Sequence, residues 1–282
     1  MIAPHSPTEL QRLYKRRFAD KGEYRDEVWR VLVGQYFARW LPPGASVLDL
    51  GCGHCEFINN VQSEKRFGMD LNPDAVHRAA PGVQILLNNC SEPWALPDAY
   101  LDVVFTSNFF EHLYTKRDLR DTLIQAWRCL RPGGRIIAMG PNIRYLPGEY
   151  WDFYDHYLAL TELSLGEVLS ETGFTLDEQI PRFLPYTMSQ GRKSPIWMLR
   201  LYLKLKFVWP LFGKQFLVVA TKSHARSPAE TEAPAGLEEL SMVNRYAGAS
   251  PNIGLAHHPP TVVDSAFAAD EARSTPQYHP PE

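Results

Sequence analysis

The sequence predicts an α/β fold, a three-layer sandwich in which helices cover both faces of a mostly parallel sheet of seven strands. The clearest sign is the segment 47–61, where a short β-favouring run enters a glycine turn and then a helix. Further β-favouring runs alternate with helical segments along the chain, as in strand–helix–strand units. The run 135–140 is almost continuously apolar, which is typical of a strand buried in a parallel sheet.

Length and composition suit such a domain. The chain has 282 residues, and its 45% of hydrophobic residues suffices for a large core. The net charge of −3 provides no general attraction to phosphate backbones, so we expect no nucleic-acid partner. The N-terminus lacks the regions of a signal peptide, and no apolar run reaches the ~20 residues that span a bilayer. We therefore expect a cytoplasmic protein.

The first 44 residues form an N-terminal segment that we expect to be helical over about 8–40. Val28, Val31, Leu32 and Tyr36 recur at helical spacing, and Pro42-Pro43-Gly44 ends the segment. The helix should pack beside the main domain, 45–222, and cover its site. Its basic residues at 15–17 are expected to form a solvated face rather than a phosphate site.

The remaining elements follow from local patterns. We expect strands near 65–70, 83–88, 102–107, 135–140, 174–176 and 214–222, and helices after 56, over 119–130 and over 161–173. Thr161 and Ser164 are both plausible caps of the last helix, and Gly173 ends it. The turn 131–134 ends the helix 119–130.

The glycine turn at 51–55 is the expected ligand site, because glycine lets the backbone approach a ligand closely. A dinucleotide-binding loop would have a third glycine where this chain has Glu56, which argues against a nicotinamide cofactor. Cys52 and Cys55 form a Cys-x-x-Cys pair, but no second pair completes a zinc shell. We therefore expect two small residues packed beside the loop and no metal.

An acid before alternating glycines, here Asp49, Gly51 and Gly53, resembles motif I of class I S-adenosylmethionine-dependent methyltransferases. Cys55 stands in place of the third glycine of that motif. The turn 130–134 and the stretch 107–112, which is similar to motif IV, extend the resemblance over about 45–222. It implies a Rossmann-like fold whose last strand is inserted antiparallel between its neighbours. It also implies S-adenosyl-L-methionine as the cofactor.

Cofactor contacts are expected at the ends of the first four strands. Asp70 ends the second strand and can accept both hydroxyl protons of a ribose, although a helix N-terminal acid is the alternative. In many members of the family an adenine-binding acid stands where this chain has Cys90, so the side-chain oxygen of Asn89 and the N–H near Ser91 are the substitutes. The predicted cofactor contacts are Asp49, Gly51, Cys52, Gly53, Asp70, Leu71, Asn89, Cys90, Ser91, Ser107 and Asn108.

Two histidines are candidates for a general base. His112 follows the fourth strand, where ligands of parallel sheets bind, and its ordinary pKa is near neutrality. A structural role for His112 remains the alternative. His156 is the second candidate, with Asp152 or Asp155 orienting its ring. The predicted catalytic residues are His112, His156 and Asp155.

The aromatic loop 141–157 is predicted to form the main wall of the acceptor site, because long loops of mixed apolar and polar character are commonly functional. The alternative is an aromatic minicore in which Asp155 and His156 only hold the loop. The predicted acceptor contacts are Phe109, His112, Asn142, Arg144, Tyr145, Tyr150 and Trp151. Residues 145–161 resemble bacterial family members that act on sugars, glycans or secondary metabolites.

An insertion at 181–213 separates the last two strands. Ser194 and Pro195 favour a helix, although 199–207 also alternates like a strand. Six basic residues and no acid lie between 192 and 214, so the segment is either a lid over the acceptor cleft, which we favour, or a peripheral membrane contact. The tail 223–282 has the composition of a disordered segment.

The expected function is S-adenosylmethionine-dependent methylation, most simply O-methylation, of a small molecule or a sugar or glycan acceptor. A noncatalytic S-adenosylmethionine-binding subunit is one alternative, and an NAD(P)-dependent oxidoreductase is another that Glu56 disfavours. The sequence leaves the oligomeric state and the methyl acceptor open.

Overall fold

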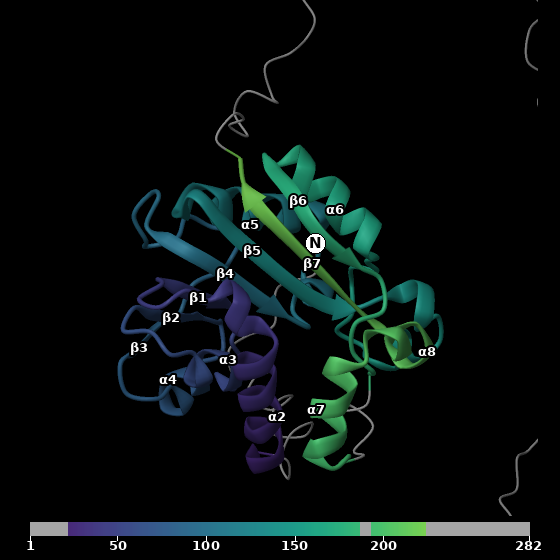
Figure 1. The fold of residues 1–282 in the computed structure, drawn as a ribbon. Helices are drawn as coiled ribbons and strands as arrows, with labels where there is room; N and C mark the ends of the chain where they lie inside the picture. The colour runs from purple at the N-terminus through teal and green to yellow at the C-terminus, as the bar shows by residue number, and fades with distance from the viewer. Residues whose placement is uncertain (1–21, 187–192, 224–282) are drawn as a thin grey trace, which may run out of the picture. The chain divides into compact units, whose positions relative to one another are not determined.

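The computed structural model describes residues 22–186 and 193–223, and the strands of this part form one seven-stranded sheet (Figure 1). The sheet order is β3-β2-β1-β4-β5-β7-β6. The first five strands pair in parallel, and β7 pairs antiparallel with both β5 and β6. The predicted fold, including the inserted antiparallel last strand, is confirmed. The strands are β1 Val47–Leu50, β2 Arg66–Met69, β3 Val83–Leu86, β4 Leu101–Ser107, β5 Leu130–Pro141, β6 Phe174–Ile180 and β7 Gln215–Lys222.

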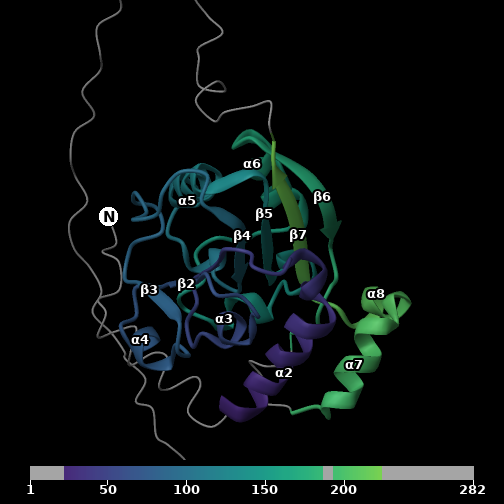
Figure 2. The same cartoon turned by 60° about the vertical axis from the view of Figure 1, so that its left-hand side comes forward.

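Helices cover both faces of this sheet (Figure 2). In strand β4, Val103 and Phe105 belong to the hydrophobic cluster shared with α2, α3 and α7, whereas Val104 belongs to the cluster shared with α5 and α6. This alternation follows from the two-residue period of a strand, and it produces three layers. The α-helices are α2 Gly22–Gln35, α3 Glu56–Asn60, α4 Asp74–Arg78, α5 Lys116–Cys129, α6 Glu162–Glu171, α7 Ile196–Lys204 and α8 Trp209–Phe212. Short 3-10 helices are η1 Phe37–Trp40, η2 Phe110–His112, η3 Ile143–Tyr145, η4 Glu149–Asp152 and η6 Lys206–Val208.

Aromatic side chains join α2 to the sheet. Phe57 of α3 stacks on Phe105 of β4 with ring centroids 3.6 Å apart, and Trp29 of α2 meets Phe105 edge-on at 5.8 Å. Within the described residues, the predicted N-terminal helix is an α-helix over 22–35 that is followed by the 3-10 helix 37–40, and it packs against the domain that follows it. Its expected first part, 8–21, lies outside the described residues.

Capping boxes begin the two long helices on the second face of the sheet. The Thr115 hydroxyl accepts from the Asp118 N–H at the start of α5, and the Thr161 hydroxyl accepts from the Ser164 N–H at the start of α6. Of the two predicted caps of α6, Thr161 is the cap. Helix α5 ends at Cys129, one residue earlier than predicted, because Leu130 already pairs with Leu101 in the sheet.

The insertion contains helix α7, so the predicted helix is confirmed and the alternative strand over 199–207 is wrong. The helix begins at Ile196, one residue after Pro195. Apart from Ser223, the predicted tail lies outside the described residues. Within the described ranges, no helix combines the length and apolar character required to cross a bilayer.

Leu123 and Leu163 form a matched pair for testing the core. The Leu123 side chain is fully buried in the cluster between α5 and the sheet, whereas Leu163 of α6 is 54% exposed. We expect Leu123→Ala to lower the free energy of unfolding by about 2 to 5 kcal/mol, because it leaves a cavity. Leu163→Ala should change it by less than about 0.5 kcal/mol. Urea denaturation of both variants measures the difference, and equal effects would contradict the described core.

Candidate active site

The crevice of this sheet lies where the strand order reverses. From β1 the chain continues to β2 and β3 on one side, and it then returns to β4 and β5 on the other side. The loops that follow β1 and β4 therefore diverge at the carboxyl edge of the sheet, where open α/β sheets bind ligands. The predicted cofactor loop and His112 both lie at this edge.

Gly51 is required in the loop after β1 for two reasons. Its φ is +71°, in the region that favours glycine, and a Cβ at this position would lie 2.3 Å from the ring of Phe109. The chain after β4 thus packs directly on the glycine loop. Cys55, in place of the third glycine of the motif, also has a left-handed backbone with φ 63°. Cys55 therefore adopts a backbone conformation that favours glycine, although it carries a side chain.

Asp70 connects the glycine loop to the end of β2. Its Oδ2 accepts from the Gly53 N–H at 2.7 Å, and its Oδ1 accepts from the Asn72 N–H at 2.8 Å. The side chain is only partly buried, and the neighbouring Leu71 is 42% exposed. Asp70 therefore fixes the loop while part of it stays accessible beside the crevice.

Three carboxyl groups surround the glycine loop. Burial raises the pKa of Asp49 well above its usual value, and the nearby charges of Glu56 and Asp70 raise it further. Burial alone would also raise the pKa of Glu56, but a hydrogen bond to His54 and the charge of Arg25 outweigh burial and lower it. Arg25 belongs to α2 and lies 2.9 Å from the Glu56 carboxylate. A cationic ligand beside Asp49 and Asp70 would favour the charged form of both carboxyl groups.

Cys52 and Cys55, the two cysteines beside the crevice, are both buried. The Sγ atoms of Cys52 and Cys55 lie 3.8 Å apart, and their hydrogen bond together with burial raises the pKa of the Cys52 thiol. Protonated thiols are poor nucleophiles and poor metal ligands. Both residues pack beside the loop, as the sequence predicts.

The segment after β3 is arranged differently from the predicted adenine contacts. The Cys90 side chain is buried and its Sγ accepts from the Thr122 hydroxyl of α5 at 3.3 Å, so it packs into the core. The Asn89 Oδ1 already accepts from the N–H and the hydroxyl of Ser91, at 3.1 and 3.0 Å. The two groups that the sequence suggested as adenine partners are thus bonded to each other.

Two buried oxygen atoms near the end of β4 lack hydrogen-bond partners among the described residues. The Thr106 Oγ1 and the Asn108 Oδ1 are buried, and neither has a hydrogen-bond partner in the structure. Asn108 has φ 49°, and its Nδ2 donates to the Ser107 Oγ at 3.1 Å. A buried acceptor without a donor is costly, so these oxygens suit a ligand that supplies N–H or O–H groups.

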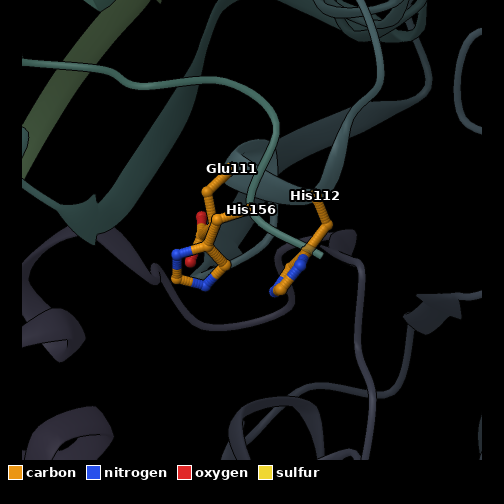
Figure 3. A group of neighbouring side chains, drawn as sticks. All are labelled: Glu111, His112 and His156. Atoms are coloured by element: carbon orange, nitrogen blue, oxygen red, sulfur yellow. The ribbon is translucent and has the colours of Figure 1, made fainter. Parts of the chain in front are cut away.

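An acid–histidine cluster, formed by Glu111, His112, Asp155 and His156, lies next to this strand end. Figure 3 shows three of its members, Glu111, His112 and His156. Glu111 and His112 come from η2, and the other two residues come from the loop after β5. The His112 Nδ1–H donates to the Asp155 carbonyl at 2.9 Å and lies 3.3 Å from its carboxylate. The His156 Nδ1–H donates to the Tyr150 carbonyl at 2.8 Å. Because a carbonyl only accepts, each neutral ring has its lone pair at Nε2.

Burial and neighbouring charges shift the pKa values of Glu111 and His112 in this cluster. Burial raises the pKa of Glu111 to about 7. Burial alone would lower the pKa of His112, but its hydrogen bond to Asp155 and the Glu111 charge outweigh burial and raise it. The sequence prediction had Asp152 or Asp155 orienting His156, whereas Asp155 lies against His112. Glu111 was not among the predicted site residues. The sequence signal that could have revealed it is an acid between the apolar residues Phe110 and Leu113, both of which are buried in the structure.

Glu111, His112 and His156 could also hold a metal ion, because their ligand atoms all lie within 4.8 Å of one another. The hydrogen bond and the 3.3 Å ion pair between His112 and Asp155 equally suit proton chemistry, because they stabilise a protonated ring.

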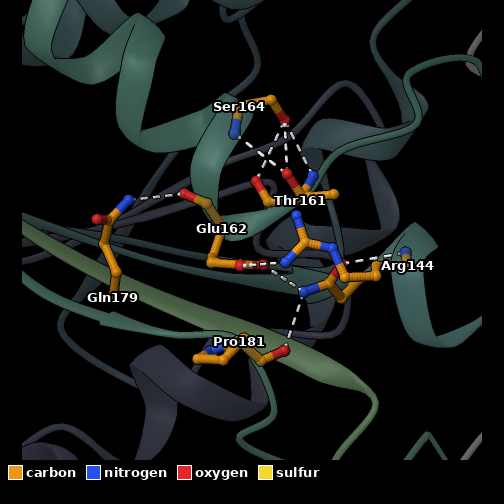
Figure 4. Close-up of polar contacts among 7 residues, drawn as sticks. Arg144, Thr161, Glu162, Ser164, Gln179 and Pro181 are labelled. Carbon is orange, nitrogen blue, oxygen red and sulfur yellow. Dashed lines mark hydrogen bonds and ion pairs between the residues drawn. The ribbon is translucent and has the colours of Figure 1, made fainter.

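The loop after β5 contains both buried supports and exposed side chains. Figure 4 shows the polar contacts that join it to Glu162 of α6. Asn142 is fully buried: its Nδ2 donates to Glu162 at 2.6 Å and to the Pro181 carbonyl at 2.9 Å. Tyr150 is also fully buried, and its hydroxyl donates to the Leu158 carbonyl. The predicted acceptor contacts at Asn142 and Tyr150 are thus corrected to supports inside the loop, as in the minicore alternative.

Other side chains of the predicted wall remain accessible. Trp151 is 57% exposed, and the Arg144 side chain, which pairs with Glu162 at 3.1 Å, is 46% exposed. Tyr145 is partly buried and carries the Arg182 guanidinium over its ring at 4.7 Å. His156 is buried, with its ring stacked on Phe153 at 4.9 Å. The loop is thus a packed unit with an accessible outer surface.

Comparison with known proteins agrees with this geometry. A family model described as a methyltransferase domain matches residues 22–179, more than half of the chain. A probable S-adenosylmethionine-dependent methyltransferase of Mycolicibacterium smegmatis is 32% identical over 148 residues, which are 50% of this chain and 56% of that protein. The chain thus spans about half the length of this relative.

Solved structures share the fold. A putative methyltransferase of Haloferax volcanii, in a complex with the Trm112 methyltransferase activator, has a TM-score of 0.57 and 18% identity, covering 79% of this chain and 99% of that chain. The [4+2]-cyclase SpnF has a TM-score of 0.55 and 14% identity, covering 79% and 98%. At such identities the likeness shows the fold alone. The family match, the glycine loop and the sheet order together show that this chain belongs to the class I S-adenosylmethionine-dependent methyltransferases.

Proposed function

We propose that this chain catalyses O-methylation of a small molecule or of a sugar or glycan acceptor, with S-adenosyl-L-methionine as the methyl donor. The observation that carries the proposal is the acid–histidine cluster beside the cofactor crevice. A hydroxyl must lose its proton when it is methylated, and this cluster offers the required proton acceptor.

Residues around the crevice fit the cofactor. Its sulfonium and ammonium groups are cationic, and a cation beside Asp49 and Asp70 would favour the charged form of these carboxyl groups, whose pKa values burial raises. The unpartnered oxygens of Thr106 and Asn108 can accept from its donors, and Asp70 is the proposed ribose partner. The left-handed backbone at Gly51 and Gly53 shapes the loop beside the crevice. When bound, the cofactor supplies an activated methyl group, so alignment of the acceptor is the main remaining task.

We assign the role of general base to His112. Asp155 holds the Nδ1 side of the ring, which leaves the Nε2 lone pair to accept the hydroxyl proton. The Asp155 carboxylate and Glu111 stabilise the imidazolium that results. His156 and Glu111 are positioning residues in this proposal, because they border His112 from inside the protein. Phe109, Arg144, Tyr145 and Trp151 remain the proposed acceptor contacts.

Cofactor binding is tested by calorimetry with S-adenosylhomocysteine. We expect the wild type to bind and Gly51→Val to lose binding, because a side chain there collides with Phe109. Gly34→Ala is the matched control, since a Cβ at Gly34 meets nothing within 4 Å. Asp70→Asn, a milder change, should weaken binding by at least tenfold. Circular dichroism checks the folding of each variant.

The absence of heat with the wild type at millimolar ligand would refute the cofactor assignment. Unchanged affinity in Gly51→Val would show that the glycine loop is not the site. Binding without any tritium transfer to sugars, nucleotide sugars, phenols or lipid-linked glycans would instead support a noncatalytic binding subunit.

The pH dependence of turnover tests the base. Neutral His112 is the active form, and its pKa is raised above 6.5, so kcat/KM should rise with pH through a value above 6.5 and be lost below it. His112→Ala should lower kcat roughly 100-fold or more. Glu111→Gln removes a negative charge that stabilises the imidazolium, so it should shift the rising limb to lower pH.

His77→Gln, at an exposed position of α4, is the control and should leave the profile unchanged. An unaltered rate in His112→Ala would rule out the base assignment. A rate that falls with a chelator and returns with a divalent cation would show that Glu111, His112 and His156 hold a metal.

A further inference from the structure

Large apolar side chains gather on the outside of the insertion. The described residues include twelve exposed large apolar side chains, and six of them lie between 197 and 212. We call these six residues the α7–α8 face: Trp197 63%, Met198 46%, Leu201 47%, Phe207 74%, Leu211 69% and Phe212 61% exposed. Proteins rarely expose so many large apolar side chains within one short segment unless that segment binds something.

The opposite side of the same segment is firmly packed. Leu203 and Trp209 are buried, and the Trp209 ring meets Phe183 at 5.1 Å and Tyr36 at 5.8 Å. The Tyr202 hydroxyl donates to the Phe183 carbonyl at 2.7 Å. The insertion is therefore anchored to the core, and its apolar outer face is a fixed feature of the fold.

Positive charges accompany the apolar residues. Arg200, Lys204 and Lys206 are exposed among them, and the described stretch 193–213 contains no acid. Apolar and aromatic side chains mixed with Lys and Arg are the composition of segments that lie in the interface of an anionic bilayer. Arg192, part of the basic run in the sequence, lies outside the described residues.

The described contacts place the insertion against the N-terminal helix. Helix α7 lies beside α2 in Figures 1 and 2, and the Tyr24 hydroxyl of α2 donates to the Ser194 carbonyl at 2.9 Å. A second copy of the chain is a poor occupant of the α7–α8 face. In a two-fold dimer the same face meets itself, which would bring the Arg200, Lys204 and Lys206 charges of both copies together.

The α7–α8 face is connected to the proposed acceptor wall. Arg182 donates to the Leu211 and Gly213 carbonyls at 3.0 and 2.7 Å while its guanidinium covers the ring of Tyr145. Lys214, just after the face, pairs with Glu149 of the wall at 2.7 Å. We infer that the α7–α8 face docks on the surface of an anionic lipid bilayer.

Vesicle flotation of the full chain tests this inference. We expect binding to phosphatidylcholine vesicles that contain one third phosphatidylglycerol, and at least tenfold weaker binding to phosphatidylcholine alone. Phe207→Asp with Phe212→Asp should reduce binding more than tenfold. Arg200→Gln, Lys204→Gln and Lys206→Gln should each reduce it roughly fivefold, and added salt should weaken it further.

Leu163→Asp is the matched control, because Leu163 is a comparably exposed apolar residue on α6, and it should bind as the wild type does. Failure of the wild type to bind anionic vesicles, or unchanged binding of the Phe207 and Phe212 variant, would overturn the inference. A dimer in light scattering that this variant dissociates would identify a second copy as the occupant instead. Calorimetry with S-adenosylhomocysteine on the same samples separates loss of docking from loss of the cofactor site.

Discussion

The contact between Gly51 and the ring of Phe109 is the constraint on which the site depends. Only a residue without a side chain lets the segment after β4 approach the glycine loop this closely. That approach brings the start of η2, and with it Glu111 and His112, to the border of the crevice. The hydrogen bond from Gly53 to Asp70 holds the loop from the side of β2. Two short contacts thus set the positions of both halves of the site.

The two halves differ in their electrostatics. Around the glycine loop, acids outnumber bases at close range, and burial together with mutual repulsion raises the pKa of Asp49. Beside β4, burial raises the pKa of Glu111 to about 7, and the hydrogen bond to Asp155 together with the Glu111 charge raises the pKa of His112. The first arrangement suits a cationic ligand, and the second suits transfer of a proton.

Sequence patterns predicted the fold well because each strand and helix depends on nearby residues. The apolar run of β5, the glycine turn after β1 and the cap at Thr161 are local signals. The site was harder to predict because its contacts join distant segments. Asp155 meets His112 across 43 positions, and Asn142 meets Glu162 across 20 positions. Nor could a pattern show that Cys90 turns into the core toward Thr122.

Cys55 has a consequence for the entropy of ligand binding. A residue with a Cβ in the left-handed region is strained by roughly 1–2 kcal/mol relative to glycine, and the full burial of its side chain helps to offset that strain. Such a residue has fewer accessible conformations than glycine, so the loop varies less in shape before a ligand arrives. The ordering that a flexible glycine loop undergoes on binding is thereby completed during folding.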